Sequence, residues 1–262
     1  QSKEYFQLAG RAGRRGIDKI GYVISLLYRP SFNYQDVKRI TTKDVEPIQS
    51  QFRLSVNTVL NLIDQHPQKE IERILRLSFF SYQKFGEKYK DIPSGVLMAR
   101  YNSIVQKLKK YGYVEEGVLT TKGRFSAHVY ADEIAMGEVF ATPFVQQLTE
   151  YQTLLVLACL VYEPKEMNKF KQPFRNEELS KLRSLLQKNE YLYREKKFLE
   201  LEDMTTLMNP IYNGKSFFEV MAFTNLLEGD LIRFFGQILD RIGQIRKAST
   251  DHLLRNKMEN CR

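Results

Sequence analysis

The sequence is poor in the residues that build disulfide frameworks and metal sites. It has two cysteines and three histidines in 262 residues. Cys159 lies inside an apolar run and Cys261 is next to the last residue, so they form no paired spacing for a disulfide or a zinc site. His66, His128 and His252 are far apart and have no nearby cysteine or carboxylate at the spacing of metal ligands. We therefore expect a reduced compartment, no metal, and surface or capping positions for the histidines.

Long hydrophobic runs are also missing. The longest, Leu154 to Tyr162, is far shorter than the ~20 residues that cross a bilayer, and the first residues carry no basic-then-apolar signal. Hydrophobic residues make up 43% and charged residues 27%, as in ordinary globular proteins. These absences predict a soluble, cytoplasmic protein without a membrane partner.

The sequence contains no complete ATP-hydrolysing motif. A DExH sequence is absent, and Gly214-Lys-Ser216 has Asn209 where the GxxxxGK[ST] loop needs its first glycine. We therefore expect this polypeptide alone to hydrolyse no ATP and to hold no cofactor.

Positive charge, in contrast, is in excess. Lys and Arg number 40 and Asp and Glu 31, which gives a formal net charge of +9. This balance favours a polyanionic partner such as nucleic acid, although many basic proteins bind nothing specific. Charge alone is a modest signal, and its placement in the sequence carries more information.

The first arginines stand in a Gly/Arg-rich string, Gln7-Leu-Ala-Gly-Arg-Ala-Gly-Arg-Arg-Gly16. Arg11 and Arg14 are three residues apart, so on a helix both would project from one side. Two guanidiniums could then converge on one phosphate group, and Gly10 and Gly13 leave room for its approach. A flexible segment or a turn that binds RNA non-specifically is the alternative interpretation of GRxGR alone.

The segment after this string has the pattern of a strand. Gly21 to Tyr28 is an apolar run bounded by turn signals and closed by Pro30, as in a buried strand. So short a piece of helix and strand cannot bury its own apolar surface. We therefore interpret the first residues as the edge of a larger domain.

From Gln51 onward the apolar spacing is helical, interrupted first by Pro67. Tyr113 to Thr120 resembles two short strands around Gly117, so helices followed by a hairpin give a winged-helix pattern. Lys107, Lys109 and Lys110 form a basic face just before it, which suits either a phosphate backbone or a structural joint. The remainder is helical, with Pro143, Pro164, Pro173 and Pro210 in the connections. The expected helices include 51–63, a second one carrying Ile71, Ile74, Leu75 and Phe79, then 98–111, 131–140, 149–162, 177–193 and a long last helix, 228–247.

The whole Gly/Arg string resembles motif VI of superfamily-two helicases, in the QxxGRAGRRG form of the superkiller and exosome-cofactor DExH-box RNA helicases. Further matches follow in the expected order. The segments similar to that family are Phe52–Leu62 (FxLxxNxxLNL), Ser78–Gln83 (SFFQFQ), Leu119–Arg124 (the wing followed by KGR), and Gly214–Glu219 with Glu228–Arg233 in a DSHCT-like C-terminal helical domain.

The resemblance implies a mainly α fold in three parts. Residues 1–39 would end a second RecA-like α/β domain, 40–128 would form a winged helix, and 129–262 a DSHCT-like helical bundle. The long arch insertion of the eukaryotic exosome helicases is absent, because only Phe85 to Leu97 occupies its place. Partner binding that depends on the arch is therefore not expected.

The resemblance also implies a function, the C-terminal part of an ATP-dependent RNA helicase that uses ATP and Mg²⁺ in its full-length form. Gln7, Gly10, Arg11 and Arg14 would bind ATP, with Arg11 and Arg14 catalytic. The implied partners are single-stranded RNA, the N-terminal RecA-like helicase core and an RNA-decay nuclease. Two alternatives stay open. The first is a DNA repair-type helicase fragment bound to single-stranded DNA, although Asn57 and the DSHCT-like matches favour RNA. The second is a winged-helix nucleic-acid-binding protein without ATP hydrolysis.

The last long helix is the predicted single-strand-gripping element. Asn225 and Glu228 fit an N-cap with a carboxylate three residues later. One face is apolar and expected to be buried, consisting of Leu231, Phe235, Ile238, Ile242 and Ile245. Another side carries the predicted nucleic-acid ligands Arg233, Gln237, Arg241 and Gln244, for which a solvated helix face is the alternative. Most phenylalanines, including Phe79, Phe80, Phe140, Phe144, Phe217 and Phe218, are expected in the core.

Overall fold

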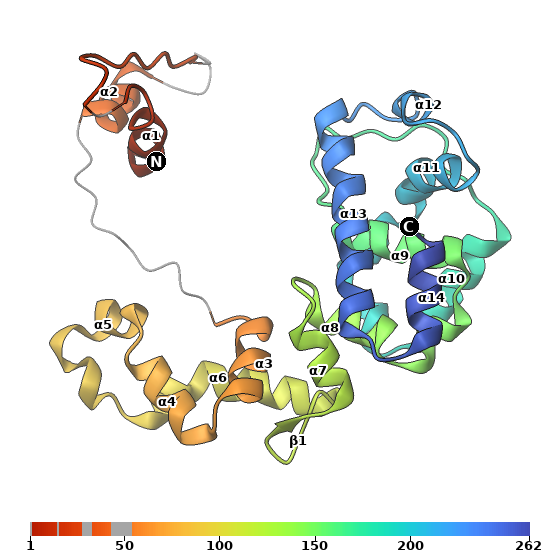
Figure 1. The fold of residues 1–262 in the computed structure, drawn as a ribbon, viewed down its shortest axis with the longest axis horizontal. Helices are drawn as coiled ribbons and strands as arrows, with labels where there is room; N and C mark the ends of the chain where they lie inside the picture. The colour runs from red at the N-terminus through yellow and green to blue at the C-terminus, as the bar shows by residue number, and fades with distance from the viewer. Residues whose placement is uncertain (1, 15, 28–32, 43–53) are drawn as a thin grey trace. The chain divides into compact units, whose positions relative to one another are not determined.

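The computed structural model describes residues 2–14, 16–27, 33–42 and 54–262. They group into two compact units, Gln1–Phe52 and Arg53–Arg262 (Figure 1). Helices dominate both units, and the described residues contain one two-stranded sheet. The prediction of a mainly α fold is confirmed.

The first unit consists of two short helices in contact with each other, α1 (Ser2–Ala9) and α2 (Tyr34–Thr42). The strand predicted at Gly21 to Tyr28 is wrong for its described part, because residues 21–27 form no strand. Ile24 and Leu26 are almost fully exposed, at 96% and 101%. The physical reason is that the described part of this unit offers no neighbouring strand to pair with the backbone of this segment. Tyr28 and Pro30 lie outside the described residues.

The second unit begins with helices and a hairpin. In chain order these are α3 (Val56–Gln65), α4 (Gln68–Arg76), α5 (Phe79–Phe85), the 3₁₀ helix η1 (Gly86–Asp91), α6 (Ser94–Lys110), β1 (Val114–Glu115) and β2 (Val118–Leu119). α3 starts later than predicted because the Ser55 hydroxyl accepts the Thr58 N–H as its N-cap; residues 51–53 lie outside the described part. Pro67 separates α3 from α4, as predicted.

The hairpin turns over two residues, Glu116 and Gly117, which both have positive φ, 48° and 84°. Such turns match the twist of the flanking strands, which is why glycine is favoured there. The predicted pair of strands around Gly117 is confirmed. A separate hydrophobic cluster lies under these elements and includes the fully buried Val59, Leu60 and Leu108.

The remaining elements form a helical bundle around one larger core. In chain order they are α7 (Thr121–Ala127), α8 (Glu133–Phe140), η2 (Pro143–Gln147), α9 (Glu150–Val161), α10 (Glu177–Lys188), η3 (Leu192–Arg194), η4 (Lys196–Glu200), α11 (Leu201–Tyr212), α12 (Phe217–Met221), α13 (Glu228–Ala248) and α14 (His252–Asn260). α9 carries the longest apolar run and packs against α10, α11 and α13 (Figure 1). A capping box between Thr149 and Gln152 fixes its start.

The structure corrects several predicted boundaries. The helix expected at 177–193 ends at Lys188, because the Asn189 side chain accepts the N–H groups of Tyr191 and Leu192 and starts a new turn. Pro210 is not in a connection but inside the last turn of α11. The helix expected at 131–140 begins only at Glu133, after the left-handed Ala131 and Asp132.

The phenylalanines that were predicted to lie in the core are divided between the core and the surface. Phe140 and Phe144 are buried, at 2% and 8% exposure. Phe79, Phe80 and Phe218 are exposed, at 51%, 40% and 75%, so their expected place in the core is wrong. They lie on the short helices α5 and α12, which are too short to bury more than one side.

No described helix is long and apolar enough to cross a membrane. Both cysteines are buried free thiols, and burial raises the pKa of Cys261 to about 11. His66 and His128 each follow the last residue of a helix, at the C-caps of α3 and α7, as expected for capping residues.

Candidate functional site

The start of α13 positions the candidate site. The predicted cap at Asn225 is wrong, because the N-cap is Leu227 and no side chain caps it. The Asn225 side chain instead accepts the Lys169 N–H and donates to the Met167 carbonyl, both at 2.7 Å. These bonds tie the segment before α13 to the loop that follows α9, so the two sides of the site are held together.

One face of α13 is buried along the whole helix. Its buried residues are Leu231, Phe234, Ile238, Ile242 and Ile245. Four of these five were predicted, whereas Phe234 replaces Phe235, which is only partly buried. The spacing of three and four residues places this stripe against the core and fixes the rotation of α13. Arg233 and Gln237 consequently face away from the core, and both are exposed.

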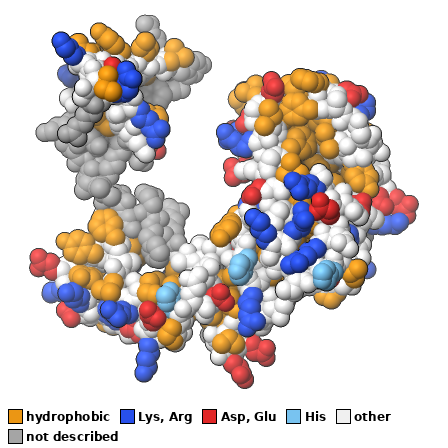
Figure 2. All heavy atoms as spheres, viewed as in Figure 1, with side chains coloured by type: hydrophobic (Ala, Val, Ile, Leu, Met, Phe, Trp, Pro, Cys, Tyr) orange, Lys and Arg blue, Asp and Glu red, His pale blue; other side chains and the backbone are white. Residues whose placement is uncertain are grey.

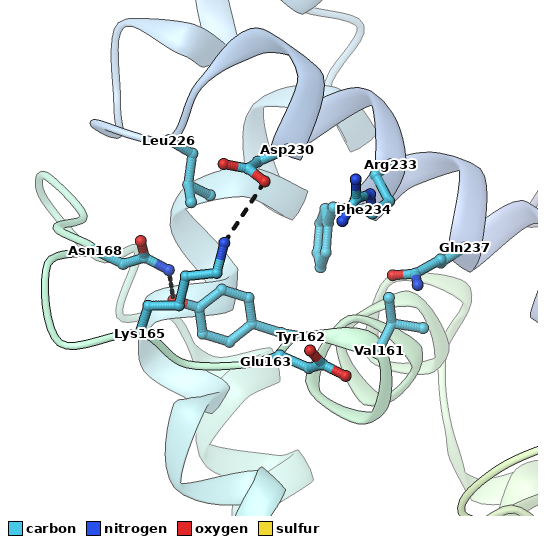
Figure 3. Close-up of a pocket in the computed structure, with 10 residues that line it drawn as sticks. All are labelled: Val161, Tyr162, Glu163, Lys165, Asn168, Leu226, Asp230, Arg233, Phe234 and Gln237. Carbon is cyan, nitrogen blue, oxygen red and sulfur yellow. Dashed lines mark hydrogen bonds and ion pairs between the residues drawn. The ribbon is translucent and has the colours of Figure 1, made fainter. Parts of the chain in front are cut away.

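A small cavity of about 140 Å³ lies beside Arg233 and Gln237 (Figure 3). Its other wall comes from the end of α9 and the loop after it, through Tyr162, Glu163 and Lys165. Figure 3 shows Arg233 and Gln237 projecting from α13 beside this wall, with Asp230 one turn earlier. The cavity therefore joins α13 to a loop more than sixty residues earlier in the chain.

Hydrogen bonds and ring contacts hold the cavity wall in place. Tyr162 packs edge-on against Phe234, with ring centroids 6.3 Å apart, and its hydroxyl accepts the Asn168 side-chain N–H at 2.7 Å. Burial raises the pKa of Tyr162, so its hydroxyl stays protonated. The Lys165 ammonium lies 3.7 Å from the Asp230 carboxylate across the mouth of the cavity. This pair is long and exposed, so it leaves Lys165 available to other anions.

Arg233 and Gln237 form no hydrogen bond or ion pair with any described residue. They are four residues apart and therefore lie on the same side of α13. Together with Lys165 they offer a guanidinium, an amide and an ammonium around one opening. Such groups donate to phosphate oxygens without depending on a base sequence.

The other two predicted ligands on α13 have bonding partners within the protein. The Gln244 carbonyl oxygen accepts the Tyr130 N–H and an N–H of Arg241, both at 3.0 Å, and its amide donates to Asp240 at 2.6 Å. Both side chains are half-buried beside the connection between α7 and α8. The structure therefore brings Arg233 and Gln237 together at the cavity and separates Arg241 and Gln244 from it.

Lys165, Glu163 and Asn168 were missed by the sequence prediction. Their loop has no helical period, and Pro164 marks only the end of α9. The one sequence signal for these residues was a glutamate and a lysine shortly after the longest apolar run, which forms α9. Two of the three lysines in the basic face of α6 have partners within the protein, because Lys110 pairs with Glu190 at 2.9 Å and Lys107 lies over the Tyr191 ring, while Lys109 is exposed.

The Gly/Arg string of the first unit is not helical where the arginines stand. α1 ends at Ala9, and Arg11 and Arg14 lie in the turns that follow, so the predicted shared helix face is wrong. The reason lies in the glycines, because Gly10 closes the helix and Gly13 has φ +81°. Gln7, Gly10, Arg11 and Arg14 are all exposed.

Arg14 has a defined partner. Its Nε donates to the Asp18 carboxylate at 3.1 Å, and its backbone N–H donates to the same oxygen at 2.7 Å. These bonds lower the pKa of Asp18 below its usual value. Gly21 lies against Ala12, where a Cβ would come within 2.3 Å of the Ala12 carbonyl oxygen. This close approach requires a glycine at position 21.

Potential metal ligands do not gather anywhere in the described part of the chain, where no group of three or more His, Cys, Asp or Glu side chains could hold an ion. The candidate site combines the cations Lys165 and Arg233 and the amide of Gln237 with two carboxylates, Glu163 and Asp230.

Comparison with known proteins points to one family. The family model described as DSHCT (NUC185) domain matches residues 116–262, which include the hairpin turn and the whole bundle. The chain is 41% identical over 86 residues to mRNA transport homolog 4 of Caenorhabditis elegans and 40% identical over 76 residues to Antiviral helicase SKI2 of Saccharomyces cerevisiae. It is 33% identical over 126 residues to Exosome RNA helicase MTR4 of Homo sapiens.

Each match covers a limited part of this chain and a smaller part of the relative. They span 33%, 29% and 42% of this chain, and 8%, 6% and 12% of the three relatives. The matched stretches are thus small portions of much longer proteins.

Proposed function

The chain belongs to the DSHCT domain family, and from this premise we propose that it is the C-terminal part of an ATP-dependent RNA helicase whose bundle holds single-stranded RNA. Three of its relatives are named as helicases: SKI2, MTR4 and the probable helicase HelY of Mycobacterium tuberculosis. Two further features support the proposal, the exposed polar edge of α13 and the Gly/Arg string near the first residue.

The observation that carries RNA binding is the pair Arg233 and Gln237, exposed and without a hydrogen bond in the described structure beside a lysine-bearing loop. A buried stripe on the opposite face holds α13 against rotation, so the two side chains stay directed at the same region. The Arg233 guanidinium suits a phosphate oxygen, and the Gln237 amide can donate or accept. A motor that moves along a strand needs such contacts, because they do not select a base.

The size of the cavity determines how a strand would lie. At about 140 Å³ it is smaller than the ~300–1,000 Å³ of small-molecule pockets. The strand would therefore pass across the opening, with its phosphates near Arg233 and Lys165, instead of inserting a base. Arg241 and Gln244 would act less directly, by fixing α13 to the connection between α7 and α8.

Arg11 and Arg14 are proposed to serve the ATP site of the complete enzyme, together with Gln7 and Gly10. The pair between Arg14 and Asp18 is exposed, and water screens exposed pairs strongly, so Arg14 can exchange Asp18 for a phosphate. ATP and Mg²⁺ would supply the phosphoryl group and its neutralising cation. The remaining ligands would come from an N-terminal RecA-like core, and residues 1–39 would belong to the second RecA-like domain.

Residues 40–128, which include the four helices α3 to α6, the hairpin and α7, are proposed to form a winged helix that joins this core to residues 129–262. An RNA-decay nuclease is the proposed functional partner, because one relative is named an exosome RNA helicase. A cytoplasmic location is proposed with it.

Fluorescence anisotropy with labelled single-stranded RNA and DNA of equal length tests the proposal. Arg233→Ala and Gln237→Ala should weaken RNA binding, and Arg233→Ala should reduce the salt slope by about 0.7 for each phosphate that Arg233 neutralises. Arg194→Ala, an exposed arginine on η3, is the matched control. Unchanged RNA affinity in both site variants would contradict the role of the site, and stronger binding to DNA would favour a DNA helicase.

A further inference from the structure

The side of α13 away from Arg233 and Gln237 is a second exposed surface, with apolar and cationic ends. At the apolar end, Ile232 and Leu239 are 56% and 49% exposed, and Phe235 between them is partly buried. The Phe217 ring contacts both Phe235 and the exposed Phe218, which extends the apolar end over α12. Figure 2 shows hydrophobic side chains gathered over α12 and the start of α13, with Lys and Arg side chains below them.

The cationic end is a pocket of about 590 Å³ between α13 and α14. It begins at Leu239 and Gly243, and its walls carry the four cations Arg246, Lys247, Arg255 and Arg262. Arg255 is held in place by a hydrogen bond from its Nε to the Ser249 carbonyl at 2.8 Å. Arg246 pairs with the Glu259 carboxylate at 2.6 Å, and the other three cations of the pocket have no carboxylate among its lining residues.

Two glycines keep the backbone of α13 accessible on this side. A Cβ at Gly236 or Gly243 would meet no described atom within 4 Å, so nothing in the described structure requires a glycine there. A glycine inside a helix costs ~1 kcal/mol relative to alanine. Gly236 and Gly243 together leave a shallow space on either side of Leu239, next to the cations.

We propose that this surface binds an amphipathic helix of a protein partner, with its apolar residues on Ile232 and Leu239 and its acidic residues in the pocket at Arg255. Ile232 and Leu239 are seven residues apart, or ~10 Å along the axis, which matches apolar side chains two turns apart on an opposing helix. The glycines allow close approach of the two backbones. The four cations fix the direction of the helix, because its acidic end must face them.

Single-stranded RNA fits this surface less well. Its bases bind by stacking on flat aromatic faces, whereas the exposed centre of this surface is the aliphatic pair Ile232 and Leu239. The surface also lies on the other side of α13 from Arg233 and Gln237. The inference is therefore independent of the RNA-binding role proposed above.

The test uses fluorescence anisotropy with a labelled amphipathic peptide that has leucines at helical spacing and glutamates in its last turns. A matched peptide has lysines in place of the glutamates. Both are titrated with this chain and with the complete helicase. We expect the acidic peptide to bind both proteins, and the lysine peptide to bind at least about tenfold more weakly, or ~1.4 kcal/mol.

Variants locate the binding on this surface. Leu239→Glu and Arg255→Glu should each weaken binding of the acidic peptide about tenfold or more, and Gly243→Trp should block it without touching the core. Leu253→Glu is the matched control, because Leu253 is 72% exposed on α14 and lies outside the pocket. Thermal melting checks that each variant is folded.

Three results would overturn the proposal. One is equal binding of the two peptides. Another is loss of RNA affinity in Arg255→Glu while peptide binding is retained, which would make the surface a nucleic-acid site. The third is peptide binding to this chain but not to the complete helicase, which would mean that the helicase itself covers the surface.

Discussion

The Lys122 ammonium lies 2.5 Å from the Glu138 carboxylate, and both side chains are nearly buried, with 17% and 9% exposure. The same carboxylate accepts the Tyr113 hydroxyl at 3.2 Å, and Lys122 also donates to the Tyr111 carbonyl at 2.9 Å. Burial and the Glu138 charge raise the pKa of Tyr113, so it remains a neutral donor. One ion pair thus connects α7 of the KGR segment, α8 of the bundle and the start of the hairpin.

Removing one partner of this pair should destabilise the second unit strongly. Glu138→Ala leaves the Lys122 charge buried without its carboxylate, while Tyr113 keeps the Ile134 carbonyl as an acceptor at 2.7 Å. The expected loss is about 3 kcal/mol in the free energy of unfolding. Urea denaturation measures it. The double variant Lys122→Met with Glu138→Leu should recover most of the loss, because no charge is left unpaired. A loss below about 0.5 kcal/mol in Glu138→Ala would contradict the buried character of the pair.

The second prediction separates residues of α13 that the sequence grouped together. Arg233→Ala should lower single-strand affinity with little change in stability, because Arg233 is exposed and has no bond to a described residue. Gln244→Ala should do the reverse, since it leaves the Tyr130 N–H without its acceptor, at a cost of about 1 kcal/mol. Anisotropy and thermal melting on the same samples give both quantities. Equal effects of the two substitutions on both measurements would refute the separation.

The third prediction concerns Arg14 in the complete helicase. Arg14→Ala should abolish RNA-stimulated ATP hydrolysis, and Arg14→Lys should also be severely impaired, because lysine keeps the charge but loses the planar fork. Arg39→Ala is a suitable control, since Arg39 pairs with Asp36 on α2 at a comparable exposed site. RNA binding without nucleotide should be unchanged in all three variants. Near-normal turnover in Arg14→Ala would remove Arg14 from the ATP site.

Elements governed by neighbouring residues could be predicted from the sequence. The hairpin around Gly117 depends on two residues with positive φ, a local preference. The length of α13 and most of its buried stripe also follow, because the apolar spacing is regular over the whole helix. The choice of Phe234 over Phe235 could not be made, since adjacent phenylalanines fit the period almost equally well. It required the position of Tyr162, which packs on Phe234.

Interactions between distant residues account for the parts of the site that could not be predicted. Asn225 satisfies the local rule for an N-cap, but Lys169 and Met167 compete for its side chain across more than fifty residues. Gln244 similarly bonds to Tyr130, 114 residues away. Arg11 and Arg14 share no helix face because α1 ends at Ala9, before both arginines, and Gly13 has positive φ between them. In each case a partner absent from the residue's sequence neighbourhood, or a backbone break, decided its position.

The short helix α12 has a carboxylate at its start with a strongly shifted titration. The Glu219 side chain accepts the Ser216 N–H at 2.8 Å, and Ser216 in turn accepts the Glu219 N–H, which forms a capping box. The bond from the Ser216 backbone, the bond from its hydroxyl and the nearby Lys215 lower the pKa of Glu219 to about 2. A carboxyl group with a lowered pKa stabilises the folded form above its unfolded pKa of ~4.3.

The fourth prediction is therefore a loss of the α12 cap as the pH falls from about 4.5 to about 2. Through this window Glu219 becomes protonated, its bond to the Ser216 N–H weakens, and the start of α12 should fray. The amide signals of Ser216 and Glu219 in NMR spectra should move together with a midpoint near pH 2. Glu219→Gln keeps an acceptor but removes the titration, so its spectra should show no such movement, while Lys215→Ala should raise the midpoint because it removes one stabilising charge. A midpoint above pH 4 in the unaltered protein would show that the capping box does not form in solution.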